Sequence, residues 1–387
     1  MASSFRFGFQ TDDIDEDMSD AEEPTTVVSE VHQDQAREQR SRPLLYVETK
    51  RHGIDELLAT LPSRIFYNTL TIKLPTGDGR QITVPRREVF DANAQLMAEE
   101  AEVDQAGNED LASQLKSFDV RHGFYEGGSK TWESSVDLAG VLVTDYSFLF
   151  AENVEEIRVI ELGSGPAIPV LAFLKTIFQL PKPSTPLRRR IHFVLSDFNL
   201  IFFRLFTAPN VLLTWYISRN PDADPISEVD IDDKLINDFR ADMAAYGISF
   251  TFISGPWSPE WADMAFPLPK EGEQPLVGKG YTLLFSSETI YSPDSLPDFV
   301  QLLVSILDRA ADRQHSPDSS NAKYSNPKAL IAAKKLYFGL GGGIDSFVST
   351  LKEMAGERAS VIEKLDINDQ GVMRGVWEVK LKGGSSR

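Results

Sequence analysis

The sequence contains no cysteine, which excludes disulfides, cysteine-ligated zinc and a thiol nucleophile. Its five histidines are scattered without the spacing of a metal site, so we expect no bound metal; they are His32, His52, His122, His192 and His315. No apolar run of about 18 residues is free of charge, and the chain does not start with a basic and apolar signal. We therefore expect no membrane span and no secretion. The lack of cysteine fits a reducing compartment, and we expect a cytoplasmic and nuclear location.

Positive charge is also scarce. The chain has 39 Lys and Arg against 58 Asp and Glu, a net charge of −19. Such a chain is a poor candidate for direct, salt-dependent binding to the phosphates of a nucleic acid. It suits a cationic partner better, although many cytosolic proteins are acidic without one. We expect a basic protein as partner, no direct contact with nucleic acid, and a monomer.

The composition divides the chain into three parts. Residues 1–42 are polar and acid-rich, with TDDIDEDMSDAEE at their centre, and we expect a disordered tail. Within this tail, SFRFGF (residues 4–9) is either a docking segment or an incidental apolar patch. Residues 43–150 form an N-terminal extension with a hairpin and helices, and residues 151–387 form the main domain.

The extension has short, mixed elements. FYNTLTIKLPTGDGRQITVP (66–85) predicts two strands around a TGDG turn. DANAQLMAEEAE (91–102) predicts a helix with Asp91 as its N-cap. TWESSVDLAGVLV (131–143) predicts a second helix, because its apolar positions recur at helical spacing.

The main domain alternates short apolar strands with helices, which predicts an α/β fold with a parallel sheet covered on both faces. We expect a long helical region to follow the second strand, to break at Pro209 and to resume to about residue 246. The last two strands are too close for a helical crossover and must form an antiparallel hairpin. The prediction is a seven-strand, Rossmann-like sheet with this C-terminal hairpin. The strands are expected at 157–162, 191–197, 248–254, 281–287, 335–340, 360–367 and 372–381.

A glycine turn, Glu161–Ala167 (ELGSGPA), leaves the first of these strands. Glycines permit a tight turn and the close approach of a ligand. The dinucleotide motif G-x-G-x-x-G fails here, because Ile168 stands where its third glycine belongs. S-adenosylmethionine fits better, since it carries a sulfonium and an ammonium that suit Glu161. A purely structural turn is the alternative.

Other strand ends carry polar or aromatic residues. Asp197, in LSDFN, can accept both hydroxyls of a ribose, or it can lie beside a helix capped by Asn199. Trp257, in SGPW, and Trp132, in SKTWESS, can each flank an adenine ring or belong to the core.

The fourth strand ends in LLFSSETIY, where Glu288 and Tyr291 follow an apolar run. The first and fourth strands neighbour each other at the switch point of such a sheet, so a carboxylate here can orient or deprotonate a nucleophile. The alternative is a salt-bridged strand end. Gly341–Gly343 lacks the Lys-Ser/Thr of a phosphate-binding loop, and we expect a flexible rim to the site.

Taken together, the motifs resemble those of the eukaryotic histidine protein methyltransferases. YEGGSKTWESSVDL, VIELGSGPAIPVL, LSDFN, ISGPW, LLFSSETIYSPDSLP and LYFGLGGG have the order and the approximate positions found in that family. The N-terminal SFRFGF and acidic tail are also similar. The chain departs from the commoner ELGCG form at Ser164, which we expect to be neutral for binding.

The resemblance implies a seven-strand methyltransferase fold, S-adenosylmethionine as donor and a target histidine in the large-subunit ribosomal protein L-three, methylated on the ring nitrogen far from the main chain. Glu288 and Tyr291 match the family's acidic-x-x-aromatic motif beside the substrate, and one of them is expected to select the imidazole tautomer. The residues implied to line the cofactor are Lys130, Thr131, Trp132, Glu133, Ser134, Glu161, Gly163, Ser164, Gly165, Asp197, Phe198, Asn199, Gly255, Pro256, Trp257 and Ser287.

Two other functions fit part of the sequence. A lysine methyltransferase of the same superfamily would share the cofactor motifs, and only the flanking family motifs distinguish the two. A factor that binds or assembles a ribosomal protein, with catalysis secondary, is suggested by the acidic tail.

Overall fold

The computed structural model describes residues 48–106, 130–145, 147–150, 154–183, 189–267, 280–314, 327–337, 341–368 and 372–382. The expected tail at 1–42, with its SFRFGF segment, lies outside these residues. The division at residue 150 stays a prediction.

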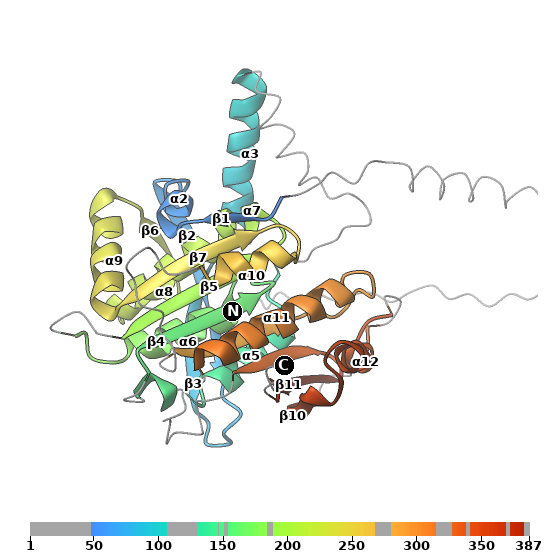
Figure 1. Ribbon diagram of the computed structural model, residues 1–387. Coiled ribbons are helices and arrows are strands. Elements are labelled where there is room, and N and C mark those ends of the chain that lie inside the picture. Colours follow the sequence, from blue (N-terminus) through green and yellow to red (C-terminus); the bar gives the residue numbers. More distant parts are fainter. Residues whose placement is uncertain are drawn as a thin grey trace, which may run out of the picture. The chain divides into compact units, whose positions relative to one another are not determined.

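The main sheet has eight strands in the order β1-β7-β5-β4-β8-β9-β11-β10 (Figure 1). Its five central strands are parallel, and they are β4 (Glu156–Leu162), β5 (Arg190–Asp197), β7 (Ile248–Ser254), β8 (Gly280–Ser287) and β9 (Lys328–Lys334). The chain proceeds from β4 outward through β5 to β7, then returns to β8 on the other side of β4. The β4/β8 pair is therefore the switch point, where ligands bind at the carboxyl ends of the strands.

The C-terminal hairpin closes one side of the sheet. β10 (Ala359–Ile367) pairs antiparallel with β11 (Arg374–Leu381), and β11 pairs antiparallel with β9. This arrangement confirms the predicted seven-strand sheet with a C-terminal hairpin. At the opposite edge the short strand β1 (Lys50–His52) adds an eighth strand, antiparallel to β7.

Helices cover both faces of the sheet (Figure 1). Along β4, Ile157 and Val159 face one layer, while Ile160 and Leu162 face the other, as the two-residue period of a strand requires. The first layer contains α5 (Glu133–Leu142), α6 (Ile168–Phe178) and α8 (Ala208–Arg219), with α9 (Asp233–Tyr246) packed beside β7. The second contains α10 (Pro259–Ala265), α11 (Leu296–Gln314) and α12 (Ile344–Ala355).

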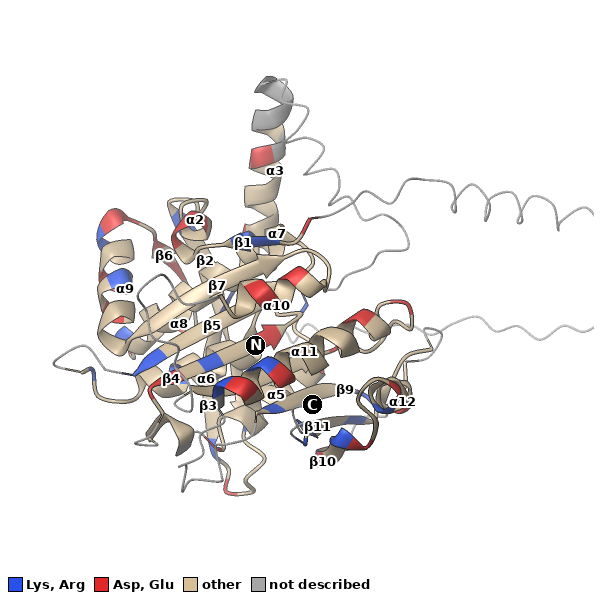
Figure 2. Cartoon of the chain, viewed as in Figure 1, with Lys and Arg blue, Asp and Glu red and all other residues tan. Residues whose placement is uncertain are grey.

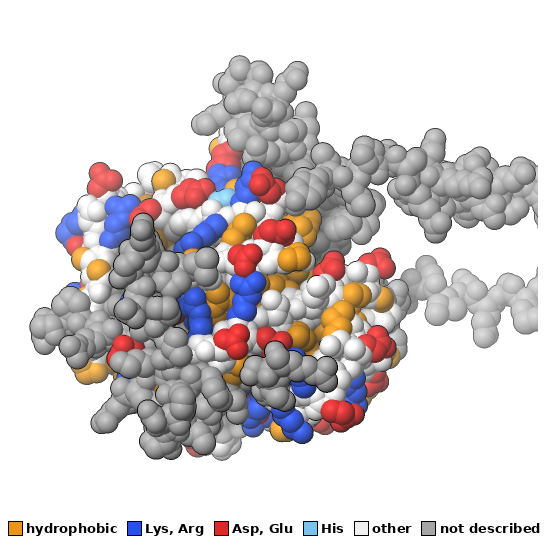
Figure 3. Space-filling model, in the orientation of Figure 1, with side chains coloured by type: hydrophobic (Ala, Val, Ile, Leu, Met, Phe, Trp, Pro, Cys, Tyr) orange, Lys and Arg blue, Asp and Glu red, His pale blue; other side chains and the backbone are white. Residues whose placement is uncertain are grey.

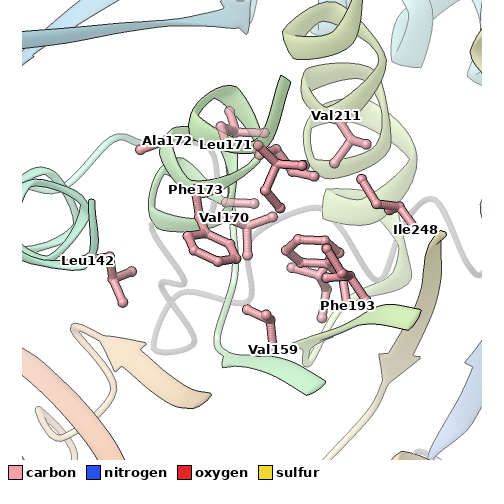
Figure 4. Close-up of a cluster of buried hydrophobic side chains, with 14 of the residues drawn as sticks. Leu142, Val159, Val170, Leu171, Ala172, Phe173, Phe193, Val211 and Ile248 are labelled. Atoms are coloured by element: carbon pink, nitrogen blue, oxygen red, sulfur yellow. The ribbon is translucent and has the colours of Figure 1, made fainter. Parts of the chain in front are cut away.

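The core of the first layer combines aliphatic side chains with the rings of Phe173 and Phe193 (Figure 4). The ring centroid of Phe173 lies 6.1 Å from that of Phe193, and Phe193 stacks on Phe250 at 5.3 Å. This cluster also includes Leu57, Ile72 and other buried side chains from the N-terminal extension. The extension therefore shares its core with the main sheet.

The predicted hairpin of the extension is confirmed. β2 (Arg64–Lys73) pairs antiparallel with β3 (Gln81–Arg87), and the TGDG turn joins them. A third strand, β6 (Ile226–Asp230), pairs with the other edge of β2. Short elements complete this part: α2 (Ile54–Leu58), α3 (Val89–Ala106) and the single-turn η1 (Ser147–Phe150).

Three details of the prediction are wrong, although α3 confirms the helix predicted at 91–102. The fifth strand is β9, residues 328–334, rather than residues 335–340. Its alanines Ala329, Ala332 and Ala333 are fully buried on the two faces of the sheet, although alanine has a low strand propensity. The expected N-cap Asp91 lies inside the first turn of α3, where it forms an ion pair with the buried Arg87.

The long helical region differs as well. It does not break at Pro209, because that residue lies in the first turn of α8, where proline is tolerated. Instead α7 (Leu200–Phe202) continues through a π-helical segment (Phe203–Thr207) into α8, and β6 interrupts the region before α9. Residues 200–219 are long and apolar enough to span a membrane, but 72% of the apolar window is buried inside the protein, which favours a core helix.

Charges of both signs are interspersed over the described elements (Figure 2). The face in Figure 3 likewise carries acidic and basic side chains with apolar ones between them. Within the described residues, the excess of negative charge is not gathered on this face.

Candidate active site

The glycine turn after β4 is held from three directions. Gly163 and Gly165 have left-handed φ angles of 70° and 47°, which favour glycine. The Gly165 N–H donates to Asp197 Oδ2 at 2.9 Å, and the Thr207 hydroxyl donates to the Gly165 carbonyl at 2.6 Å. A Cβ on Gly163 would lie 2.6 Å from Cγ2 of Thr289. The turn therefore packs directly against the loop that follows β8.

Glu161 is the residue that best tests whether a cationic ligand fits here. It is 0% exposed, and both of its carboxylate oxygens lack a hydrogen-bond partner among the described residues, as does the buried hydroxyl of Ser164. Burial raises the pKa of Glu161 well above its usual value; the approach of the Val170 backbone N–H opposes this shift, and the nearby charge of Asp197 adds to it. A buried, unsatisfied carboxylate is costly, and the ammonium or sulfonium of S-adenosylmethionine would satisfy it. The residues present thus fit this cofactor.

Asp197 joins three strand ends. Its carboxylate accepts from the Gly165 N–H and, at 3.2 Å, from the Asn199 N–H, while its carbonyl accepts from the Gly255 N–H at 3.1 Å. Burial raises its pKa to about 6. Asn199 is the N-cap residue of α7, but its side chain makes no capping hydrogen bond. The neighbouring Phe198 is exposed. Asp197 thus organises the edge, and its predicted contact with a ribose stays a prediction.

The predicted SGPW residues lie at the end of β7. The half-buried Trp257 packs against Phe299 of α11, with ring centroids 5.0 Å apart. The Pro256 carbonyl accepts from the Thr49 hydroxyl at 3.1 Å, and a Cβ on Gly255 would lie 2.9 Å from the Glu48 carbonyl oxygen. The chain before β1 therefore closes over this strand end, and the adenine contact of Trp257 stays a prediction.

The segment 130–134 brings a second aromatic residue to the site. Trp132 is the N-cap residue of α5, and two ammonium groups lie over its ring, those of Lys130 at 4.3 Å and Lys334 at 5.1 Å. Arg86 of β3 donates to the Thr131 hydroxyl at 3.0 Å. Glu133 is exposed, whereas Ser134 is buried and donates to Glu288 Oε1. Ser134 thus contacts the predicted catalytic carboxylate.

Glu288 directly follows β8 and has a left-handed φ of 56°, which is strained for a residue with a Cβ. Its N–H donates to the Ala332 carbonyl at 2.9 Å, and its Oε2 accepts from the Tyr337 hydroxyl at 2.6 Å. Burial raises its pKa, while the hydroxyls of Ser134 and Tyr337 and the charge of Lys334 oppose this shift. Glu288 is therefore a partly exposed carboxylate held by both oxygens.

The rest of LLFSSETIY is fixed by local contacts. The Ser286 hydroxyl donates to the Leu162 carbonyl at 2.6 Å and lies 2.7 Å from the Thr289 hydroxyl. Ser287, the predicted cofactor wall, ends β8 and is half-buried. Tyr291 is half-buried, and its ring meets that of Tyr337 edge-on, with centroids 6.3 Å apart.

The structure thus brings the predicted residues of four strand ends to one edge. Glu161 is the penultimate residue of β4, Asp197 and Ser287 end β5 and β8, and Gly255 follows β7. Sequence reasoning missed Tyr337, Lys334 and Thr289. The sequence predicts the fifth strand at 335–340, which puts Lys334 before the strand and Tyr337 inside it. In the structure β9 ends at Lys334, so Lys334 and Tyr337 lie at the carboxyl edge of the sheet. Among the described residues, no group of three or more His, Asp or Glu could hold a metal ion.

No protein-family model matches the chain. It is 29% identical over 375 residues to histidine protein methyltransferase 1 of Saccharomyces cerevisiae, covering 90% of this chain and 91% of that protein. It is 28% identical to the protein of that name in Schizosaccharomyces pombe, covering 87% of each. The homologue in Bos taurus is 28% identical, over 68% of this chain and 58% of that protein.

Solved structures show only weak likeness. Trm1 from Pyrococcus horikoshii with S-adenosyl-L-methionine has a TM-score of 0.29 and 11% identity, covering 66% of this chain and 57% of that one. The CMeT domain of the citrinin polyketide synthase has a TM-score of 0.30 and 10% identity, covering 64% and 53%.

The strand order, the glycine turn and the unsatisfied Glu161, together with the two yeast relatives, define an S-adenosylmethionine-dependent methyltransferase. Within that class, the chain is a homologue of the histidine protein methyltransferases of yeasts and mammals.

Proposed function

We propose that this enzyme methylates a protein histidine on the ring nitrogen far from the main chain. One observation carries the proposal: a carboxylate, Glu288, is held at the switch point beside the glycine turn by hydroxyls from two other elements. The names of the relatives support histidine as the acceptor.

S-adenosylmethionine, when bound, would supply a methyl group on a positively charged sulfur. Glu161 would face one of its cationic groups, and Asp197 would accept from its ribose hydroxyls. Trp257 and Trp132 would flank its adenine, with the remaining predicted residues of the strand ends around it. These assignments are part of the proposal.

The imidazole needs orientation more than activation. With a pKa of about 6.5 it is mostly neutral at cell pH and already has a lone pair on one ring nitrogen. The site must select the tautomer that carries its proton on the near nitrogen. Glu288 is suited to this role, because each of its oxygens accepts one hydrogen bond and has a lone pair free for a further donor. Tyr291 is the alternative residue for it.

Glu288 would also act as the methyl group is transferred. As the far nitrogen bonds to the methyl carbon and the carbon–sulfur bond breaks, the ring would become a cation whose near N–H still donates to Glu288. The negative charge of Glu288 would stabilise that cation more than it stabilises the neutral ring, which is the differential binding that lowers a barrier. The proton on the near nitrogen then passes to Glu288 or to water.

The proposed substrate is a basic protein, in particular the large-subunit ribosomal protein L-three. The net charge of −19 supports a cationic partner. A location in cytoplasm and nucleus and a monomeric state belong to the same proposal.

A labelling experiment tests it. The full-length chain is incubated with purified large-subunit ribosomal proteins and S-adenosylmethionine labelled in its methyl group, and the products are hydrolysed to amino acids. We expect the label in histidine methylated on the far nitrogen. Label in methyl-lysine would instead favour a lysine methyltransferase.

A further inference from the structure

We infer that Tyr337 is a positioning residue for Glu288, whose carboxylate it holds by a hydrogen bond between the chain after β9 and the chain after β8. The inference rests on the proposed function, because Glu288 is the group proposed to orient the histidine. Tyr337 follows β9 and lies outside the motifs at the glycine turn and after β8.

The hydrogen-bond pattern fixes the direction of the Tyr337 hydroxyl. The backbone N–H of Lys334 donates to its oxygen at 3.3 Å, so the proton of the hydroxyl is free to point at Glu288 Oε2, 2.6 Å away. The side chain is buried, and burial together with the neighbouring carboxylate raises its pKa far above that of a free tyrosine. Tyr337 therefore remains a hydrogen-bond donor at every pH at which the enzyme works.

The glycines after Tyr337 allow the backbone packing that fixes the position of the Tyr337 ring. Gly343 donates to the Ile290 carbonyl at 3.1 Å, and a Cβ on Gly342 would lie 2.2 Å from the Tyr291 carbonyl oxygen. Leu336 and Gly343 form an antiparallel bridge, which brings the chain back beside Tyr337. Gly342 and Gly343 thus permit the backbone after Tyr337 to lie close to the segment after β8, where the Tyr337 hydroxyl contacts Glu288.

Charged groups on the neighbouring elements also act on Glu288. Lys334 of β9 lowers its pKa, and Glu133 of α5 raises it. Ser134 of α5 satisfies the other carboxylate oxygen. The Tyr337 hydroxyl is the neutral group that donates to Oε2 of Glu288. Removing this hydroxyl therefore leaves a mostly buried oxygen without its hydrogen-bond donor.

The variant Tyr337→Phe removes only the hydroxyl. Losing a hydrogen bond to the charged form raises the pKa of a carboxyl group, so the pKa of Glu288 should rise further in this variant. We expect the acidic limb of the kcat/KM profile to move to higher pH by the same amount, and kcat to fall about tenfold, while affinity for S-adenosylmethionine stays unchanged. The titration of the free substrate histidine is unaffected, so the displaced limb belongs to the enzyme.

Carbon-13 NMR measures the pKa of Glu288 directly, in protein labelled at its glutamate carboxyl carbons and without S-adenosylmethionine or substrate. The variant Glu288→Gln identifies the Glu288 signal, because that signal is absent from its spectrum. The matched control is Tyr67→Phe, a buried tyrosine in a separate cluster that donates to the Asp224 carbonyl at 3.0 Å. The control is expected to change neither the titration nor the pH profile. If Tyr337→Phe does not fold, 3-fluorotyrosine placed at position 337, a stronger donor, is expected to lower the pKa of Glu288.

The outcomes separate the two proposals. An unchanged Glu288 titration in Tyr337→Phe, or in the fluorinated chain, overturns the inference even where histidine is methylated. A shifted titration in a chain that labels no histidine overturns the proposed function and leaves Tyr337 as the residue that sets the charge of Glu288.

Discussion

At the scale of single residues, the buried Glu161 and the partly exposed Glu288 show how two carboxylates at one sheet edge differ in role. Glu161 has no hydrogen-bond partner among the described residues, whereas Glu288 has one at each oxygen. The first is suited to a cation that arrives with a ligand. The second is already oriented before any ligand binds.

The variant Glu161→Gln should lower the affinity for S-adenosylmethionine by about 10- to 100-fold, because a charge-assisted contact is lost. Isothermal titration calorimetry measures this directly. The control is Glu378→Gln, a buried glutamate on β11 that is paired with Lys380. Equal affinities of Glu161→Gln and the unaltered chain would contradict the fit of Glu161 to a cationic ligand.

The same residue predicts a pH effect on stability. The pKa of Glu161 is raised in the folded chain, so the folded form holds its proton more tightly than the unfolded form does. Stability therefore falls as pH rises above the unfolded value of about 4.3, until the folded carboxyl group has also ionised. Thermal melts at several pH values, without S-adenosylmethionine, should show a smaller loss of stability with rising pH in Glu161→Gln than in the unaltered chain. The same pH dependence in both chains would contradict the raised pKa of Glu161.

Glu288→Gln should reduce turnover by about 100-fold with cofactor binding intact, because an amide can neither stabilise the cation nor accept its proton. Tyr291→Phe tests the alternative residue for the same role. Turnover of labelled protein is the measurement, with calorimetry for the cofactor. Near-full turnover in both variants would refute the assignment of either residue to tautomer selection.

At the scale of elements, the strand-end residues of β4, β5, β7 and β8 could be predicted because their apolar runs end clearly. β9 could not, since KALIAAK is rich in alanine and gives way to the more strand-like KLYFGL. Only the pairing of β9 with β8 and β11 fixes it, and such pairing is a tertiary property. Tyr337 was missed for the same reason.

Gly342→Ala tests the packing of the loop after β9. A Cβ there would overlap the Tyr291 backbone at 2.2 Å, so we expect a loss of more than about 2 kcal/mol in the free energy of unfolding and a loss of turnover. Chemical denaturation measures the first quantity. Gly53→Ala is the control, because nothing lies within 4 Å of its Cβ and its φ is −93°. Similar stability of the two variants would show that the loop can move aside.

At the scale of the whole molecule, the extension and the main sheet share one core, which the sequence did not indicate. Leu57 and Ile72 of the extension join the cluster around Phe173 and Phe193. Local patterns predict elements, but they do not predict which apolar faces meet. The net charge, by contrast, is a property of composition and was available at once.

Deletion of residues 1–42 tests the contribution of the acid-rich tail, which lies outside the described residues. We expect the shortened chain to bind basic ribosomal proteins roughly tenfold more weakly, with a smaller dependence on salt, because it loses long-range attraction. Affinity at several salt concentrations is the measurement. Unchanged affinity and salt dependence would exclude the tail as a substrate-binding element.

Mapping the methylated residue by fragmentation mass spectrometry tests the central claim most directly. Large-subunit ribosomal proteins are treated with the full-length chain or with Glu288→Gln, and their peptides are compared. The proposed function predicts one added methyl group on a histidine, on the ring nitrogen far from the main chain, with the unaltered chain and strong loss with Glu288→Gln. A methyl group on lysine, or none on any histidine, would contradict it.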